Sequence, residues 1–435
     1  MNKKNKKIKL SFSEKNIILF VGNIHEGVLE DIRKFTDAQN KKFKLAVIFD
    51  PKSKSGKKIP KNKELDIFIK CDMSSKQKIK KALSPYKNQF LAVTVRSERD
   101  VQYFQRIIPF VKNTVKVPDV KSLDYATSKL KMRKRLISYD KKIAPLFMPV
   151  KNTKKETIDK IEKKIGFPLI IKPSGLANSA LISSCQNKKE LEDSLKKTFK
   201  NIDKIHKSVD GRGKKEIIVE QFLFGKMYSL DVCITDKGKV YFLPFVREVI
   251  ANEVGYNDFF TYKTLIPVKL SDVDIRSGQN TAKKAIKAIG LKNSVAHIDL
   301  MKTKDGWKII EIAARIGAFR RKIYKLSYNI NQSLNDILNK LSKKPLIPVK
   351  ILGHSVVFSF FAEKEGKLKK IEGIRKVRKL NSFYSLNIKK KMEEKCLFAK
   401  NGGTGVLTVT LFNKDEKKLN KDIKELEKYI KIKTK

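Results

Sequence analysis

The first quarter of the chain alternates short apolar runs with polar segments that are compatible with helices. The apolar runs IILFVG, KLAVIFD, LDIFIK and FLAVTV lie at residues 17–22, 44–50, 65–70 and 90–95. A helix is expected over 24–37 and in the polar segments between the later runs. Alternation of strand and helix is typical of a doubly wound parallel sheet. The pattern therefore predicts an α/β domain over residues 1–120.

The alternation stops near Pro118, and the next section mixes helices with strands. This section is predicted to form a second unit over 121–345. The helix over 272–289 ends at Gly290, a residue type that stops helices. The expected helices are 123–139, 154–165, one from Lys188 onward, and 272–289; the expected strands are 168–173, 216–225 and 228–234.

The last section, residues 346–435, is predicted to be a small α+β domain. Strand-like runs VVFSFFA and VLTVTLF, at 356–362 and 406–412, flank a basic middle, and a closing helix is expected over 417–433. The glycines at 402, 403 and 405 are interpreted as turn residues. Nothing in this section carries a chemistry that the sequence can name.

Two acidic residues near the end of the second section are predicted to face each other. Alternating runs at 297–303 and 307–312 flank Lys304-Asp305-Gly306, a three-residue connection of the kind that closes β-hairpins. Such a loop pairs Thr303 with Trp307, which brings Asp299 opposite Glu311. Residues two apart along a strand point to the same side, so both carboxylates share one face of the hairpin.

Like charges opposed across two strands are destabilising unless a cation lies between them. Magnesium carrying nucleotide phosphates is the simplest such cation, since it commonly binds one or two carboxylates and takes its other oxygens from phosphate and water. The alternative is a solvated strand face, with Lys302, Lys304 and Lys308 reducing the repulsion. Arg315 favours the first interpretation, because a guanidinium just beyond the hairpin suits a phosphate or carboxylate.

The charge of the chain is extreme but evenly distributed. Its 435 residues include 98 lysines and arginines against 45 acids, a net charge of +53. Lysine is spread over nearly every segment, whereas a nucleic-acid footprint would be a basic stripe with stacking aromatics. A field this positive attracts polyanions at low salt, but no specific nucleic-acid partner is indicated.

Cysteine and histidine offer little catalytic material. The four cysteines, Cys71, Cys185, Cys233 and Cys396, have no CxxC spacing, so neither a structural zinc nor a disulfide framework is indicated. The four histidines are scattered. The basic start of the chain lacks the apolar run of an export signal, and no segment is apolar for long enough to span a bilayer. A cytoplasmic protein without a membrane partner is expected.

The order of these elements resembles that of the ATP-grasp superfamily up to about Pro345. YATSKLKMRKRL is similar to the segment entering the ATP-grasp core, and implies that Lys129 contacts nucleotide phosphates. FPLIIKPSGLANSALI resembles the strand with the second nucleotide lysine, Lys172, followed by a small-residue loop that includes Ser179. IIVEQFLFGKMYSLDV is similar to the strand that contacts adenine and ribose, with Glu220 at the acidic position.

HIDLMKTKDGWKIIEIAARIG resembles the metal-binding strand pair of the same superfamily. The resemblance implies that Asp299 and Glu311 bind magnesium and that Arg315 contacts the transferring phosphoryl group or the acyl phosphate. The chain departs from the family pattern at Ala313, where many members have a metal-coordinating asparagine. It departs again at Met227, which replaces a glutamate near the ribose.

The phosphate loop also departs from the pattern, because Leu176, Ala177 and Leu181 make it poorer in glycine than usual. The resemblance implies a preceding α/β domain, as predicted above. It also implies ATP and Mg²⁺ as cofactors, and an ATP-dependent ligase that joins a small-molecule carboxylate to an amine through an acyl phosphate. Arg315 and Lys172 are then the catalytic candidates.

Two other functions remain open from the sequence. A phosphotransferase would use the same core on a hydroxyl group, and a basic nucleic-acid-binding protein would keep only a vestigial nucleotide pocket. Arg247, Tyr256, Asp258 and Arg320 are weighed as substrate contacts but are interpreted as surface or packing residues. Neither the identity of the substrates nor the oligomeric state, a homo-oligomer included, follows from the sequence.

Overall fold

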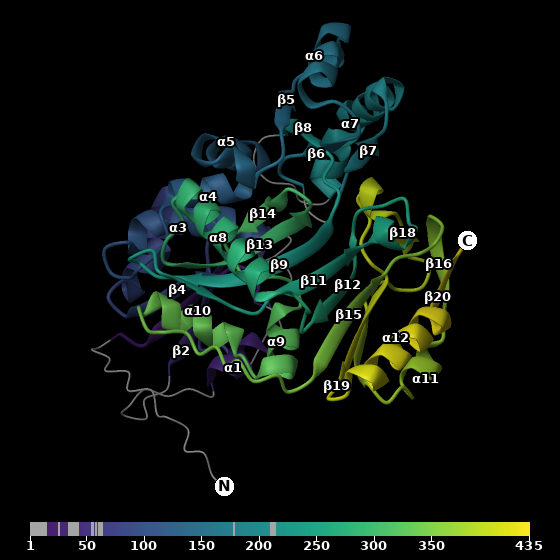
Figure 1. Ribbon diagram of the computed structural model, residues 1–435. Coiled ribbons are helices and arrows are strands. Elements are labelled where there is room, and N and C mark those ends of the chain that lie inside the picture. Colours follow the sequence, from purple (N-terminus) through teal and green to yellow (C-terminus); the bar gives the residue numbers. More distant parts are fainter. Residues whose placement is uncertain are drawn as a thin grey trace.

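The computed structural model describes residues 15–24, 27–33, 43–53, 56, 59, 64–176, 179–208 and 215–435 (Figure 1). Its first unit contains a four-stranded parallel sheet in the order β3-β2-β1-β4, as the apolar runs predict. The elements are β1 (Ile17–Val21), α1 (Val28–Arg33), β2 (Lys44–Phe49), β3 (Ile67–Lys70), α2 (Lys76–Leu83), β4 (Phe90–Val95) and α3 (Val101–Val111).

Helix α1 differs from the predicted helix over 24–37. It begins at Val28, after Gly27 in the left-handed region with φ of 74°. A residue in this conformation cannot continue an α-helix toward the N-terminus, so the prediction was wrong about the start. Residues 34–37 of the predicted helix lie outside the described part of the chain.

The helix predicted over 123–139 is two helices, α4 (Val120–Thr127) and α5 (Lys129–Tyr139). Ser128 between them has extended backbone angles, with φ of −106° and ψ of 113°, and its side chain accepts a hydrogen bond from the backbone of Lys131. A serine that caps a helix in this way favours a new helix start over a continuous helix. The break places Lys129 in the first turn of α5.

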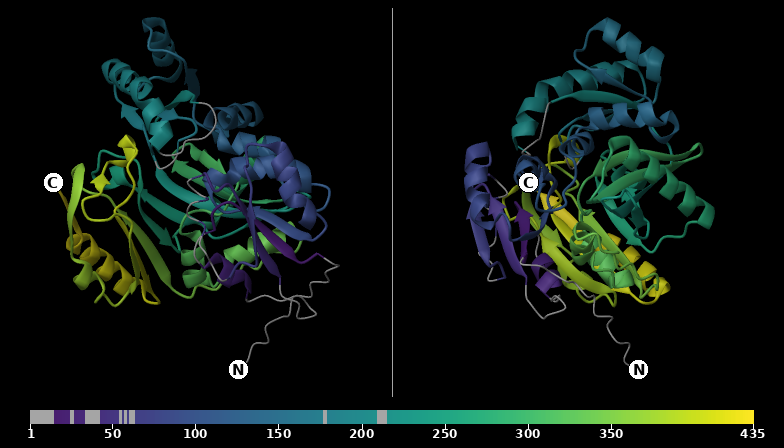
Figure 2. Two further views of the ribbon diagram at one scale, coloured as in Figure 1. Left: turned by 180° about the vertical axis from the view of Figure 1, so that it is seen from behind. Right: turned by 90° about the vertical axis from the view of Figure 1, so that its left-hand side faces the viewer.

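A separate lobe follows, with an antiparallel sheet in the order β5-β8-β6-β7 and two helices on it. In both views of Figure 2 the lobe rises above the remainder of the molecule. Its apolar core joins both helices to the sheet through side chains such as Ile158, Leu191 and Ile171. The elements are β5 (Phe147–Val150), α6 (Lys155–Ile165), β6 (Leu169–Pro173), β7 (Ser183–Cys185), α7 (Lys188–Ser208) and β8 (Ile217–Gln221).

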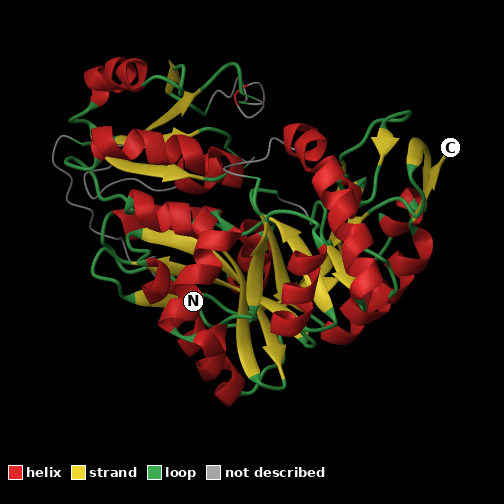
Figure 3. Ribbon diagram, turned by 90° about the horizontal axis from the view of Figure 1, so that it is seen from above, coloured by secondary structure: helices red, strands yellow, loops and turns green. Residues whose placement is uncertain are grey.

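The largest sheet has nine strands in the path β14-β13-β9-β11-β12-β15-β19-β17, with β10 paired to β9. It runs without interruption from the second section of the chain into the third (Figure 1). Figure 3 shows the strands and the helices beside them from above. Its strands are β9 (Lys226–Ile234), β10 (Val240–Phe242), β11 (Val246–Ile250), β12 (Thr261–Ile266), β13 (Ser294–Thr303), β14 (Gly306–Ala313), β15 (His354–Phe360), β17 (Phe383–Ile388) and β19 (Leu407–Asn413).

The helices that accompany this sheet are α8 (Asp272–Ile289), α9 (Arg320–Tyr328), α10 (Gln332–Lys340), α11 (Ile374–Val377) and α12 (Glu416–Tyr429). A further small sheet has the order β18-β16-β20, with β16 (Gly366–Glu372), β18 (Lys395–Cys396) and β20 (Lys431–Thr434). Helix α8 has the predicted bounds, and Gly290 is left-handed with φ of 67°. The closing helix predicted to reach 433 ends at Tyr429, and the chain then pairs as a strand with β16.

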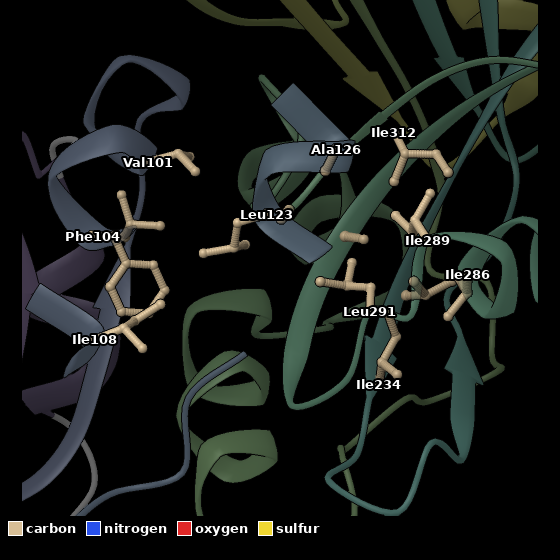
Figure 4. Packing of buried hydrophobic residues seen from close by; sticks show 14 of the residues in the cluster. Val101, Phe104, Ile108, Leu123, Ala126, Ile234, Ile286, Ile289, Leu291 and Ile312 are labelled. Atoms are coloured by element: carbon tan, nitrogen blue, oxygen red, sulfur yellow. The ribbon is translucent and has the colours of Figure 1, made fainter. Parts of the chain in front are cut away.

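One apolar core joins the first unit to the large sheet. In Figure 4, Phe104 and Ile108 of α3 face Leu123 of α4, and the same cluster continues to Ile286 of α8 and Ile312 of β14. Because burial of such side chains is the main stabilising contribution in folding, these units hold a fixed relative position. That position matters because the first unit supplies side chains to the site described below.

Helix α10 makes a second connection between the same parts. Leu334, Ile337 and Leu338 pack against the sheet of the first unit. On the other side, the Asn339 amide donates to the backbone oxygen of Ile234, and Nζ of Lys340 donates to that of Asn293 at 2.7 Å.

The four cysteines are buried and free, which confirms that they form no disulfide with one another. Within the described ranges, no helix combines the length and the apolar character needed to cross a bilayer.

Candidate functional site

A cavity of about 1250 Å³ lies between the lobe and the nine-stranded sheet. The lobe supplies residues of β6 and β8, and the sheet supplies residues of β9, β11, β12, β13 and β14. The first unit adds residues 97–99, and the C-terminal section adds Lys389, Thr404 and Gly405. All the residues predicted from sequence to bind nucleotide or metal line this cavity; they are Lys129, Lys172, Ser179, Glu220, Asp299, Glu311 and Arg315.

The predicted pairing of Asp299 with Glu311 is present, but it arises differently from the prediction. Thr303 pairs with Gly306 rather than with Trp307, so the connection has two residues and not three. The register then shifts by one residue between Asp299 and Leu300, and the shift restores Asp299 opposite Glu311. The predicted three-residue turn was therefore wrong, whereas the predicted pairing of the two acids was correct.

The shift is a β-bulge, and it decides which side chains reach the cavity. Trp307, Ile309 and Ile312 lie in the apolar core, whereas Ile310 and Glu311, which are adjacent in sequence, both line the cavity. A strand without a bulge would place Glu311 on the same face as Trp307 and Ile309. The sequence contained a signal for the bulge, because the apolar residues at 307, 309 and 312 do not keep the two-residue spacing of a regular strand.

Asp299 lies beside a histidine that the sequence argument did not select. In the sheet, His297 of β13 pairs with Asp231 on one side and Ala313 on the other. Its Nδ1 is 2.6 Å from the Asp231 carboxylate, and its Nε2 is 3.0 Å from Oδ1 of Asp299. Burial opposes protonation, but the two carboxylates outweigh it and raise the pKa of His297 to about 9.

Glu311 also has a protein cation beside it. Nζ of Lys129 lies 3.1 Å from the Glu311 carboxylate. The repulsion between the two opposed acids is therefore reduced at Asp299 by His297 of β13 and at Glu311 by Lys129 of α5. The sequence argument weighed a metal ion and three neighbouring lysines for this role, but it overlooked His297 on the hairpin itself and Lys129 from a distant helix.

The carboxylates still fit a divalent cation. Oδ1 of Asp299 is buried, and Nε2 of His297 lies 3.0 Å from it. Ligand atoms of Glu248, His297 and Asp299 all lie within 4.8 Å of one another. The carboxylate oxygens of this group suit magnesium, whereas His297 with its raised pKa is protonated and offers no ligand atom. Ala313 offers no oxygen, and the residue paired with it across the strands is His297.

Glu220 is not an exposed acid available to a ribose. It is 1% exposed, and its carboxylate accepts from Nε of Arg133 at 2.5 Å and from Nζ of Lys172 at 2.8 Å. Burial raises the pKa of Glu220, but Arg133 and Lys172 together outweigh burial and lower it to about 2. Arg133 also donates to the backbone oxygen of Ile310 at the bulge, at 2.7 Å.

This group of three contains two cations and one anion, so it carries a net positive charge. Burial, together with repulsion from Arg133, outweighs the attraction of Glu220, so the pKa of Lys172 is lowered. An incoming anion would restore the balance. The buried group is therefore suited to phosphate, and Lys172 is the cation of the group that lines the cavity.

The loop after β6 is described at residues 174–176 and 179–182, while Ala177 and Asn178 lie outside the described ranges. Ser179 has a left-handed backbone, with φ of 59°, and its hydroxyl donates to the backbone oxygen of Phe259 at 2.9 Å. The backbone of Leu181 donates to that of Lys400 at 2.9 Å, so the loop contacts the C-terminal section.

Arg315 contacts an acid of the first unit. Its Nε lies 2.9 Å from the carboxylate of Glu98, which follows β4 in a short 3₁₀ turn, and both side chains line the cavity. The sequence argument placed Arg315 near the carboxylates of the hairpin but missed Glu98. No local signal marks Glu98, because the contact depends on how the first unit packs on the large sheet.

The residues weighed as substrate contacts make structural contacts. Arg247 pairs with Glu253, and buried Arg320 pairs with Glu248 and donates to Ser229 at 2.6 Å. Asp258 accepts hydrogen bonds from the backbone of Phe259 and Lys400. These contacts agree with the interpretation of these residues as packing residues.

Residues 165–322 match the sequence model of the ATP-grasp domain. A D-alanine–D-alanine ligase of Bacillus velezensis is 25% identical over 169 residues, which are 37% of this chain and 42% of that ligase. The chain thus spans about two fifths of the length of this relative. The matched region contains β6, β8 and the β13–β14 hairpin, and so most of the cavity wall.

Solved structures are similar over nearly the whole chain. An L-amino acid ligase from Bacillus licheniformis has a TM-score of 0.73 at 17% identity, covering 97% of this chain and 99% of that one. An N5-carboxyaminoimidazole synthetase from Staphylococcus aureus has a TM-score of 0.67 at 16% identity, covering 96% and 98%. A biotin carboxylase domain from Hydrogenobacter thermophilus has a TM-score of 0.63 at 13% identity, covering 96% and 91%.

These comparisons agree with the observed sheet order. Residues 165–322 match the ATP-grasp domain and are preceded by an α/β unit and followed by a C-terminal section, and this arrangement confirms the predicted fold class.

Proposed function

We propose that this protein is an ATP-dependent ligase that joins a carboxylate to an amine and releases ADP and phosphate. The observation that carries the proposal is the cavity face of β13 and β14, where Asp299 and Glu311 are directly paired next to Lys129. The match to the ATP-grasp domain over these strands supports it. So do the similar structures from S. aureus, which holds ADP, and H. thermophilus, which holds MgADP.

Lys129 and Lys172 bind the nucleotide phosphates in this proposal. Lys172 is held by Glu220 in a buried group with net positive charge, so its ammonium is fixed in place before a nucleotide binds. Prearranged cations stabilise developing negative charge without reorganisation during the reaction. Ser179 lines the same cavity and keeps its oxygen available as a hydrogen-bond acceptor, while its backbone N–H is the group suited to phosphate.

Asp299 and Glu311 would hold magnesium, which supplies positive charge against the phosphate oxygens. His297 contacts Asp299 and is itself held by Asp231, and these contacts fix the orientation of the Asp299 side chain. Carboxylates supported by such outer contacts keep their geometry when a ligand binds.

The reaction proceeds in two displacements. An oxygen of the substrate carboxylate attacks the γ-phosphorus of ATP, the bond from that phosphorus to the bridging oxygen breaks, and ADP leaves. The amine nitrogen then attacks the acyl carbon, the carbon–oxygen bond to phosphate breaks, and the nitrogen loses a proton to give the amide. Arg315 steadies the negative charge in both steps, since it lines the cavity with Glu98 as its partner.

The test is a product assay with purified protein, ATP, magnesium and pools of carboxylic acids. Hydroxylamine replaces the amine, so any acyl phosphate is trapped as a hydroxamate together with ADP and free phosphate. The proposal expects hydroxamate with at least one acid. ADP that forms without free phosphate, together with a phosphorylated product, would instead identify a phosphotransferase. No ADP with any acid, and no nucleotide binding, would contradict both enzymatic functions.

A further inference from the structure

The cationic side chains that line the cavity fall into two groups. Five of them pair with acids: Lys129 with Glu311, Lys172 with Glu220, Arg315 with Glu98, Arg320 with Glu248, and His297 with Asp231 and Asp299. The other two, Arg99 and Lys389, form no ion pair with any residue in the part of the chain that the structure describes. One comes from the first unit and the other from the C-terminal section.

Lys389 is the more informative of the two, because its ammonium has a defined position. It directly follows strand β17, and its backbone N–H donates to Val406 at 2.7 Å. Its Nζ lies 5.5 Å from the centre of the Phe319 ring. The side chain is exposed, and desolvation by the surrounding protein lowers the pKa of Lys389.

Phe319 is a rigid support for this ammonium. Its backbone is left-handed, with φ of 62°, which is an outlier for an aromatic residue and persists only where the surroundings impose it. Those surroundings are Arg320, which is buried against Glu248, and Gly317, where a Cβ would lie 2.4 Å from Nδ1 of His297. A cation over an aromatic face without a carboxylate partner keeps its charge available to a ligand.

The position of Phe319 separates Lys389 from the proposed phosphate lysines. Phe319 lies four residues beyond Arg315, in the segment that connects β14 to α9, whereas Lys172 lies on β6 of the lobe. Resting on the proposed function, Lys389 lines the part of the cavity that the C-terminal section contributes and contacts the segment that follows Arg315, the residue proposed to steady the reacting group.

We propose that Lys389 binds an anionic group, a carboxylate or a phosphate, on a substrate of the ligase, and that this group does not react. At least one of the two joined molecules therefore carries a negative charge besides the carboxylate that is activated. Two sources share this chemistry: a second anionic group on the acid, as in a dicarboxylate, or the carboxylate of an amino acid that acts as the amine.

The experiment compares wild type with Lys389→Met, which keeps the length of the side chain but removes the charge, and with Lys389→Arg, which keeps a cation. Lys391→Met is the matched control, since Lys391 is exposed two residues further on and does not line the cavity. Hydroxamate formation reports on the acid alone. Amide formation with an amino acid, and separately with its uncharged amide derivative, reports on the amine.

The expected result is a KM increase of roughly ten- to a hundredfold in Lys389→Met for one substrate, as for the loss of a charged hydrogen bond. The increase disappears when that substrate lacks the extra anionic group, Lys389→Arg restores most of the affinity, and the KM for ATP is unchanged. An increase already present in the hydroxamate assay assigns the anionic group to the acid. An increase confined to amide formation assigns it to the amine.

The proposal is overturned if Lys389→Met leaves every KM unchanged, affects charged and uncharged analogues equally, raises the KM for ATP instead, or matches Lys391→Met. Titration calorimetry with the same acids and amines provides a second readout that does not require turnover. If wild type forms no hydroxamate, the ligase proposal fails by itself. Weaker binding of charged compounds to Lys389→Met would then still support an anion site, and equal binding would reject it.

Discussion

The charges that the middle segment of the chain, residues 121–345, contributes to the cavity differ from those that the flanking units contribute. In the middle segment, Lys129, Lys172 and Arg320 each have an acidic partner within the protein. In the flanking units, Arg99 and Lys389 form no ion pair with a described residue. Paired charges keep their geometry before a ligand arrives, whereas an unpaired cation can pair with an anion on the ligand. Under the proposals above, the middle segment is preorganised for the nucleotide and the flanking units bind the substrate.

The largest effect is expected where the paired charges are proposed to meet metal and nucleotide. Asp299→Asn and Glu311→Gln each replace a carboxylate with a neutral group of the same shape. Turnover should fall by roughly 10²–10³-fold, as when one preorganised charged contact is removed from an active site. Steady-state ADP formation measures the loss, and circular dichroism checks that the fold is kept. Unchanged turnover in both variants would reject the assignment of these residues.

The next effect concerns stability rather than turnover. Glu220→Gln leaves Arg133, which is 1% exposed, without its carboxylate partner. Removing one member of a buried ion pair costs about 3–5 kcal/mol of the free energy of unfolding. Urea denaturation measures this value. Asp159→Asn is the control, because its pair with Lys188 is exposed and should contribute nothing measurable.

The contribution of Glu220 to the free energy of unfolding should depend on pH. Because the pKa of Glu220 falls from 4.5 to about 2 on folding, its contribution to stability is complete above pH 4.5 and is lost as the pH falls toward 2. The free energy of unfolding of wild type should therefore decline more steeply across this window than that of Glu220→Gln. If the free energies of unfolding of the two proteins declined in parallel, the contacts with Arg133 and Lys172 would not lower the pKa of Glu220.

The smallest effect is expected at an unpaired cation. Arg99→Met removes a half-buried guanidinium that forms no ion pair with a described residue, so the free energy of unfolding should change by about 0.5 kcal/mol or less. The comparison is made by urea denaturation beside Glu220→Gln. A loss as large as that of Glu220→Gln would mean that paired and unpaired cations are not distinct classes.

Local sequence patterns predicted most of the elements that carry the site. The strands of the first unit, helix α8 with its terminal glycine, and the β13–β14 hairpin are all present. Each is set by neighbouring residues: apolar runs, a left-handed glycine and two alternating segments with a turn. The pairing of Asp299 with Glu311 was also predicted correctly, although the observed register arises differently. The turn is one residue shorter than predicted, and a β-bulge offsets this difference.

The sequence pattern by itself paired Asp299 with Glu311, and the resemblance to the ATP-grasp superfamily indicated the two lysines, Lys129 and Lys172, that line the cavity with them. Only the tertiary structure decided which charge meets which. The contacts of Lys129 with Glu311, of Arg133 with Glu220 and of Arg315 with Glu98 join segments far apart in the chain. Such pairs depend on how three units pack around one cavity, and local sequence patterns do not predict that packing.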